Sequence, residues 1–218
     1  MLKCVMFDMD GTIADTEPLC LAAFGAALAA TGGREFTKAE IMATYGPSEE
    51  GCLKALVGDR AGEGYKIYLE HYEAHHRRLC PAPFPGIREV FDLVLARGAA
   101  LALITGKSAA SLALDLDAFG LKKWFRIIKT GRPEGADKPL DMRAVLEELG
   151  LAPGEAAYIG DAPADIVSAR AAGVSSLAAA WAPGADMDQL RSLKPDRLCL
   201  TVDDLADCLK EALPPSRP

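Results

Sequence analysis

The chain has 218 residues, of which 50% are hydrophobic and 25% are charged, and its net charge is −7. This length and balance are typical of a globular enzyme with a sizeable core. Because surfaces that bind nucleic acid are basic, the acidic balance argues against a nucleic-acid partner. No apolar run approaches about 18 residues, so we expect neither a membrane span nor a signal peptide.

The first 15 residues contain a short strand that runs into two acids. Lys3 to Phe7 is mostly apolar and predicts a strand, in which Asp8 and Asp10 would point to the same side. Gly11 would then allow a sharp turn. Two carboxylates at the end of a buried strand repel each other, and a divalent metal ion is the simplest group that would hold them together.

The region between about residues 16 and 80 shows no strand-like alternation. Helices are expected over residues 19–31, 38–44, 49–56 and 64–79, with Thr16 as the N-cap of the first. Pro81, Pro83 and Pro85 with Gly86 would form a stiff boundary. We therefore expect an all-helical domain of residues 16–81, inserted into a domain made of residues 1–15 and 82–218.

From residue 86 onward, helices and strands alternate. Strands are expected over residues 99–104, 125–128, 156–159, 174–180 and 198–202. The helices expected between and after them cover residues 87–97, 108–119, 140–149, 163–172, 187–193 and 203–213, and residues 214–218 read as an irregular tail. This alternation predicts an α/β fold with a doubly wound, Rossmann-like parallel sheet.

In such sheets, ligands bind outside the carboxyl ends of the strands. The residues that follow the predicted strands are acids, hydroxyls and lysines: Asp8, Asp10 and Thr12 after the first strand, Thr105-Gly106-Lys107 after the second, Lys129 and, past a loop, Lys138 after the third, and Gly160-Asp161 with Asp165 after the fourth. The sequence therefore predicts one polar site at this edge.

Cysteines and histidines provide little for other kinds of site. Cys4, Cys20, Cys52, Cys80, Cys199 and Cys208 are scattered without a CxxC pair, which is typical of reduced, mostly buried thiols in the cytoplasm. His71 and His75 could share a helix face, but no third ligand completes a zinc site. The run of residues 75–78, His-His-Arg-Arg, reads as a solvated helix end.

Four segments, in order, resemble the motifs of the haloacid dehalogenase-like hydrolases: Asp8-Met9-Asp10-Gly11-Thr12, Thr105, Lys138-Pro139 and Gly160-Asp161-Ala162-Pro163-Ala164-Asp165. The resemblance covers nearly the whole chain, and the helical insertion is similar to that family's α-helical cap domain. Residues 7–19 and 154–173 look most like the phosphatases of phosphoglycolate and of sugar phosphates.

The resemblance implies a Mg²⁺-dependent phosphatase that acts on a small phosphate monoester. Asp8 would be the nucleophile and form an aspartyl-phosphate, while Asp10 would protonate the leaving alcohol and then activate water. Thr105 and the backbone N–H of Gly106 would bind the phosphoryl oxygens. Lys138 would hold both the phosphoryl group and Asp8.

The same resemblance implies the metal ligands and the substrate-binding loop. Mg²⁺ would be held by Asp8, the backbone carbonyl of Asp10, and Asp161, with Asp165 as a further ligand or a neighbour of one. Specificity would come from the helical insertion, where the loop from Gly46 to Ser48 resembles one that reaches the active site in related phosphatases. Two positions depart from the family pattern, namely alanine at position 162 and the absence of a second proline after Pro139.

Two alternatives remain open at this stage. A sugar-phosphate mutase would share the same site, although Leu19-Cys20 offers no histidine where related mutases tend to carry one. A receiver-like signalling protein also surrounds a phosphorylated aspartate with acids, a threonine and a lysine, but such domains are shorter and lack a helical insertion. We expect a small-molecule ligand, no membrane or nucleic-acid partner, and a monomer or weak homodimer.

Overall fold

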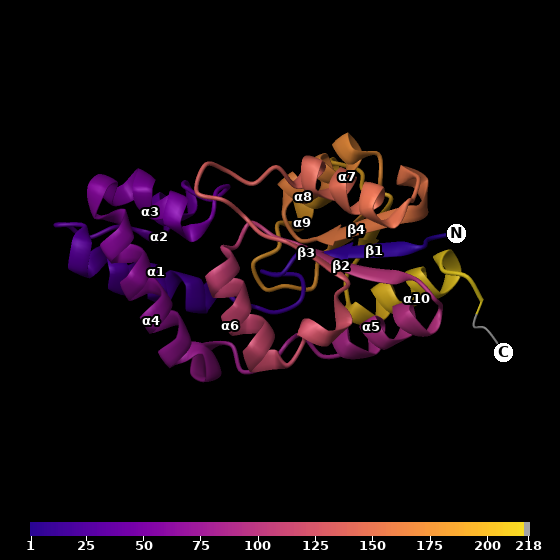
Figure 1. Ribbon diagram of the computed structural model, residues 1–218, viewed down its shortest axis with the longest axis horizontal. Helices are drawn as coiled ribbons and strands as arrows, with labels where there is room; N and C mark the ends of the chain where they lie inside the picture. The colour runs from indigo at the N-terminus through magenta and orange to yellow at the C-terminus, as the bar shows by residue number, and fades with distance from the viewer. Residues whose placement is uncertain (216–218) are drawn as a thin grey trace.

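The computed structural model describes residues 1–215, and its centre is a six-stranded parallel sheet (Figure 1). The strands are β1 (Cys4–Phe7), β2 (Ala100–Ile104), β3 (Ile127–Lys129), β4 (Ala156–Gly160), β5 (Ser175–Ala179) and β6 (Arg197–Cys199). Their order is β3-β2-β1-β4-β5-β6, with every neighbouring pair parallel. The doubly wound α/β fold is therefore confirmed, and the order reverses between β1 and β4.

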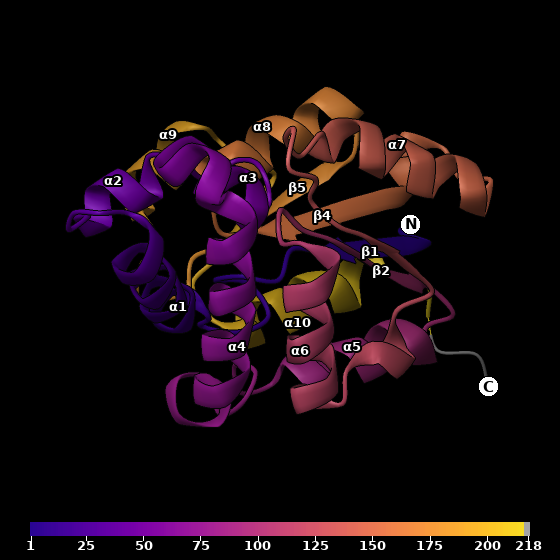
Figure 2. The ribbon, with the colours of Figure 1, turned by 60° about the vertical axis from the view of Figure 1, so that its left-hand side comes forward.

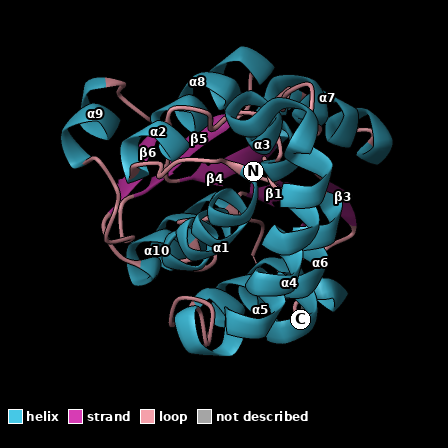
Figure 3. Cartoon of the chain, turned by 90° about the vertical axis from the view of Figure 1, so that its left-hand side faces the viewer, coloured by secondary structure: helices cyan, strands magenta, loops and turns pink. Residues whose placement is uncertain are grey.

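Helices cover both faces of the sheet (Figure 3). One side carries α5 (Ile87–Ala96), α6 (Ala109–Phe119) and α10 (Val202–Ala212), and the other carries α7 (Lys138–Leu149), α8 (Pro163–Ala172) and α9 (Met187–Ser192). Strand β1 is buried on both faces, since Phe7 meets Phe91 of α5 edge to face at 5.1 Å while Met6 packs in the cluster that holds Met142 of α7. Burial on both faces explains why this strand is a continuous apolar run.

Four helices between β1 and α5 lie together beside one end of the sheet (Figures 1 and 2). They are α1 (Glu17–Thr31), α2 (Lys38–Met42), α3 (Glu49–Val57) and α4 (Ala61–Leu79), and we call residues 17–79 the helical insertion. Helices α1 and α4 pack along each other through aromatic side chains, with the ring centroids of Phe24 and Tyr68 4.8 Å apart. Tyr72 follows one turn later in the same buried row.

The expected elements are all present, and most of their boundaries differ from the expected ones by one to three residues. Helix α7 begins at Lys138 rather than at residue 140, because the Asp137 side chain accepts a hydrogen bond from the Leu140 N–H at 3.0 Å and starts the helix earlier. The last strand ends at Cys199, since Thr201 caps α10 from residue 202 onward. The third strand is shifted to residues 127–129.

The prediction of unpaired, mostly buried cysteines holds for the described residues, where all six thiols are free and five of them are buried. No helix in residues 1–215 is long and apolar enough to cross a bilayer. Of the tail expected to be irregular, residues 216–218 lie outside the described part of the chain.

Candidate active site

The loops that follow β1, β2 and β4 meet at one edge of the sheet. Phe7 at the end of β1 pairs in register with Leu103 of β2 and Ile159 of β4, so the residues after each strand emerge at the same level. Asp8 and Asp161 consequently flank the point where the strand order reverses, which is where open α/β sheets bind their ligands.

Asp8 is buried and held by two donors. Its Oδ1 accepts the Met9 N–H at 2.7 Å, and its Oδ2 accepts the Lys138 ammonium at 2.5 Å. Burial raises the pKa of Asp8 from 3.8 to about 6; the Lys138 charge opposes this rise, and Asp165 and Asp10 add to it. Asp8 is therefore a desolvated carboxyl aimed at a single ammonium group.

Three carboxyl groups gather here, and two of them, those of Asp8 and Asp165, contact that ammonium. Oxygen atoms of Asp8, Asp161 and Asp165 lie within 4.8 Å of one another, and Lys138 Nζ also contacts Asp165 Oδ1 at 2.6 Å. Burial raises the pKa of Asp161 well above its usual value, and the charges of Asp165 and Asp8 raise it further. Three hard oxygen donors this close to one another fit a divalent cation such as Mg²⁺.

Two glycines make this packing of acids possible. Gly11 has φ +69°, and a Cβ there would lie 2.2 Å from Asp161 Oδ2. At Gly160, a Cβ would lie 2.3 Å from Asp165 Oδ2. The Thr12 hydroxyl also donates to Asp161 Oδ1 at 3.1 Å. The backbone is thus fitted closely around the two carboxylates that follow β4.

The Asp10 side chain lies outside this acid cluster. Its Oδ1 accepts hydrogen bonds from the Thr16 hydroxyl and from Lys107 Nζ, the latter at 2.9 Å. Thr16 is the N-cap residue of α1, as predicted, but its side chain accepts no hydrogen bond from the helix, and its hydroxyl donates to Asp10. The Asp10 side chain is therefore not one of the carboxylates placed to hold an ion together, which are those of Asp8, Asp161 and Asp165.

The predicted phosphoryl-binding residues lie beneath a loop of the helical insertion. Thr105 is buried, and its Oγ1 accepts the Lys107 N–H at 3.3 Å. The carbonyl oxygen of Gly46 lies 3.9 Å from the point where a Cβ of Gly106 would be. Ser48 donates its backbone N–H to the Arg132 carbonyl at 3.0 Å, and its buried Oγ has no partner among the described residues. The loop from Gly46 to Ser48 therefore borders the site.

Several other polar side chains are paired with one another. Lys129 is 3.9 Å from Glu148, and Glu17 pairs with Lys38, while Lys54 pairs with Asp59 at the surface. The His71 and His75 rings stack at 3.9 Å on α4.

Sequence reasoning missed a buried polar cluster beside Asp10. It consists of Lys107, Tyr72, His76 and Asp115, each with less than a tenth of its surface exposed. The solvated helix end expected for residues 75–78 was wrong at His76, which is 5% exposed, because its ring turns inward to Asp115. The four-residue spacing of Tyr72 and His76 on one helix face was the signal available in the sequence.

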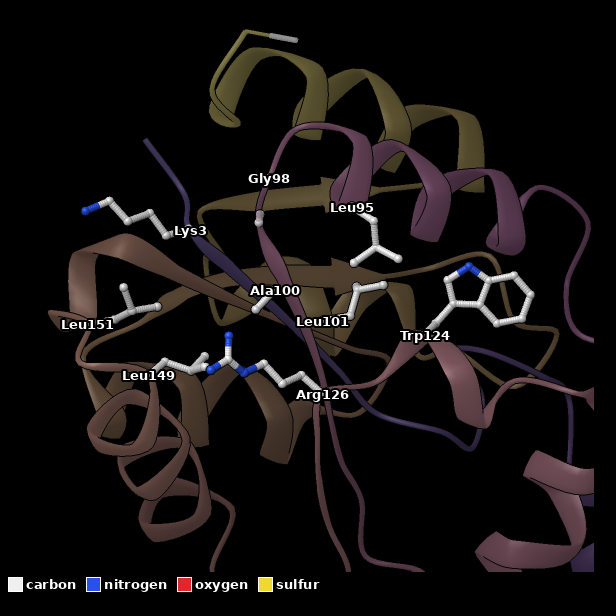
Figure 4. A pocket seen from close by; sticks show the side chains of 10 residues that line it. Lys3, Leu95, Gly98, Ala100, Leu101, Trp124, Arg126, Leu149 and Leu151 are labelled. Carbon is white, nitrogen blue, oxygen red and sulfur yellow. The ribbon is translucent and has the colours of Figure 1, made fainter. Parts of the chain in front are cut away.

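A large hollow lies at the opposite edge of the sheet. Its volume is about 410 Å³, and Figure 4 shows that Lys3, Leu101, Trp124 and Arg126 line it. These residues surround the amino ends of β1 and β2, with neither an acid nor a nucleophile among the lining side chains. The candidate active site is therefore the acid cluster and not this cavity.

The chain is similar to known hydrolases over most of its length. Residues 5–179 match the family described as haloacid dehalogenase-like hydrolase. A pyrophosphatase PpaX of Halalkalibacterium halodurans is 26% identical, and the match covers 94% of this chain and 96% of that protein. A phosphoglycolate phosphatase of Neisseria gonorrhoeae is 29% identical, covering 96% of this chain and 94% of that protein.

Solved structures show the same fold. CbbY from Rhodobacter sphaeroides, crystallised with phosphate, is 21% identical, with a TM-score of 0.77 and coverage of 94% of this chain and 96% of that one. A Thermotoga maritima protein provisionally named a beta-phosphoglucomutase is 26% identical, with a TM-score of 0.75 and coverage of 97% and 100%.

Proposed function

The chain belongs to the haloacid dehalogenase-like hydrolase family, and we propose that it is a Mg²⁺-dependent phosphatase of small phosphate monoesters. The observation that carries the proposal is the buried Asp8 carboxylate, which Lys138 holds inside an acid cluster at the carboxyl edge of the sheet. A receiver-like role is disfavoured, since the family match and the helical insertion both belong to a hydrolase architecture.

In this proposal each side chain has one task. Asp8 attacks the phosphorus atom and becomes an aspartyl-phosphate, while Asp10 donates a proton to the leaving oxygen and later removes one from water. Thr105 and the Gly106 N–H bind the phosphoryl oxygens, and Lys138 neutralises their charge. Mg²⁺ would neutralise further negative charge on the phosphoryl group. Its ligands would be Asp8, Asp161 and the Asp10 carbonyl, with Asp165 as a further ligand or a neighbour of one.

The substrate is proposed from the relatives and from the helical insertion. Related phosphatases bear the names of phosphoglycolate and pyrophosphate hydrolases, so small dianionic esters and pyrophosphate are the first compounds to test. We further propose that residues 16–81 act as a cap over the site, with Gly46 and Ser48 next to the substrate, and that the protein is a cytoplasmic monomer or weak homodimer. The free thiols support the cytoplasmic location.

The decisive experiment measures phosphate release from a panel of phosphate esters and pyrophosphate, with Mg²⁺ or with a chelator. Asp8→Asn should lower turnover by about 10³-fold or more, because a neutral amide is a poor nucleophile. Asp188→Asn changes an exposed acid at the start of α9 and serves as the matched control. Full activity in chelator, or turnover retained in Asp8→Asn, would contradict the proposal.

The same panel separates hydrolysis from the alternative of a mutase. A mutase returns the phosphoryl group to a sugar and produces an isomer of the substrate, whereas a phosphatase releases inorganic phosphate. The similarity to the Thermotoga maritima protein makes ³¹P NMR of hexose phosphates the direct check. Isomer formed without phosphate would favour the mutase.

A further inference from the structure

We infer that Lys107 is a positioning residue, which holds the Asp10 carboxyl in place and is itself anchored by Tyr72, His76 and Asp115. The inference rests on the proposed function, in which Asp10 transfers the protons. It adds a residue to that reaction that neither the predicted motifs nor the acid cluster contains.

Every proton of the Lys107 ammonium has an acceptor. The group is 3% exposed, and Nζ donates to Asp10 Oδ1 at 2.9 Å, to the Tyr72 hydroxyl at 3.0 Å and to Cys20 Sγ at 3.6 Å. An ammonium has three donors, so these three hydrogen bonds use all of them. Burial alone would lower the pKa of Lys107, but the charges of Asp10 and Asp115 raise it well above the usual value.

Asp115 anchors this ammonium from behind. Its carboxyl is fully buried, with Oδ2 3.4 Å from Lys107 Nζ. Its Oδ1 accepts the Tyr72 hydroxyl at 2.8 Å and lies 2.9 Å from His76 Nε2. Tyr72 and His76 come from α4 of the helical insertion, whereas Asp115 comes from α6 of the sheet layer, and the two helices pack together (Figure 2). Side chains of both the helical insertion and the helices on the sheet therefore hold Lys107 in place.

This arrangement leaves one oxygen of the Asp10 carboxylate without a donor. Both of its donors, Thr16 and Lys107, bind Oδ1, and no described residue donates to Oδ2. The Asp10 side chain is 39% exposed, so packing alone does not fix its rotation. Lys107 therefore holds Oδ1 and leaves Oδ2 to exchange the proton with the leaving oxygen and with water. A proton donor acts only when it is held within reach of its partner.

The test uses two substrates that differ in their need for a proton. The p-nitrophenolate group of p-nitrophenyl phosphate leaves without protonation, whereas an alkoxide must be protonated as it leaves. Rapid mixing with Mg²⁺ gives the rate of phosphoenzyme formation from each substrate. Lys107→Met should slow this step by about 10–100-fold for an alkyl phosphate and by less than about 3-fold for p-nitrophenyl phosphate.

Three further variants keep the test interpretable. Lys107→Met/Asp115→Asn removes one positive and one negative charge together and should show the same selectivity if Lys107→Met folds poorly. Tyr72→Phe removes one anchoring hydroxyl. It should also slow phosphoenzyme formation selectively for the alkyl phosphate, but by a smaller factor than Lys107→Met does. Its matched control is Tyr68→Phe, which removes a buried hydroxyl without a partner among the described residues and should leave both rates unchanged.

The outcomes distinguish this inference from the proposed function. Selective loss with the alkyl ester supports a positioning role for Lys107, because a purely structural role would slow both substrates alike. Equal losses on the two esters, in the variants that fold, overturn the inference and leave the phosphatase intact. A wild-type protein that hydrolyses no ester with Mg²⁺ overturns the proposed function and this inference with it.

Discussion

At the scale of single residues, Asp8 and Asp10 lie two positions apart in sequence but in different surroundings. Asp8 is buried against Lys138, whereas Asp10 is partly exposed and is held by Thr16 and Lys107. A desolvated carboxylate beside one ammonium suits a nucleophile, and an accessible carboxyl suits the exchange of protons. The two proposed roles therefore have separate physical grounds.

Asp8 is expected to destabilise the metal-free protein at neutral pH. A carboxyl whose pKa rises on folding from 3.8 to about 6 contributes stability below about pH 4, and that contribution is lost as the pH rises to about 6. The loss amounts to at most about 3 kcal/mol. Asp8→Asn should therefore raise the melting temperature in chelator by about 3–8 °C at pH 7.5, and by less at pH 4.5. A lower melting temperature of the variant at pH 7.5 would contradict this account.

A side chain at Gly11 is expected to impair both activity and stability, because it would collide with Asp161 and because the backbone angle there disfavours one. Gly11→Ala would add a Cβ 2.2 Å from Asp161 Oδ2, whereas Gly33→Ala would meet nothing within 4 Å at nearly the same φ, +67°. Both substitutions place alanine in the left-handed region, which costs about 1–2 kcal/mol. Only Gly11→Ala should also lower phosphate release, by about 10-fold or more, in a steady-state assay. Equal effects of the two variants would show that the backbone angle alone matters.

At the scale of elements, helix α3 is docked against the loop that leads into α7. A Cβ at Gly51 of α3 would lie 2.3 Å from the Pro133 carbonyl oxygen, and the Ala136 N–H donates to the Gly46 carbonyl at 3.3 Å. The α7 end of this loop carries Lys138 in the first helical turn. The position of the helical insertion and that of Lys138 are therefore linked through one short loop.

Gly51→Ala should separate that contact from helix propensity. The variant should raise KM for the best substrate by about 5-fold or more, because α3 must move away from residue 133. Gly25→Ala makes the same change in α1, where a Cβ would meet nothing within 4 Å, and should stabilise the protein by up to about 1 kcal/mol without changing KM. Thermal melts and steady-state kinetics of both variants check this, and an unchanged KM in Gly51→Ala would exclude a functional role for the docking.

At the scale of the whole molecule, metal binding should couple to folding stability. Like charges clustered on Asp8, Asp161 and Asp165 favour any state that adds a cation, so Mg²⁺ should stabilise the folded chain. At 100 times its dissociation constant, the gain is about 2.7 kcal/mol, or about 5–10 °C for a chain of this size. Asp161→Asn should remove most of this shift in a melting experiment. A shift of the same size in the variant would place the ion elsewhere.

The sequence by itself determined the order of the elements and the residues at the strand ends. Apolar periodicity, prolines and glycines act over a few neighbouring residues, so the six strands, the inserted helices and the edge with Asp8, Thr105 and Asp161 could all be predicted from local patterns. Parallel strands place their carboxyl ends at one edge, and the acids that follow β1 and β4 consequently came together. The start of α7 was missed by two residues, since the cap at Asp137 was overlooked.

The tertiary structure alone decided which charges share a buried space. Lys107 meets Tyr72 and Asp115 because α4 packs on α6, and no local pattern specifies the packing of two helices separated by strand β2 and helix α5. Packing also turned His76 inward and directed the Thr16 hydroxyl to Asp10. Local propensity fixes where an element begins and ends, whereas the partner of a buried polar group depends on contacts between distant segments that form only in the folded chain.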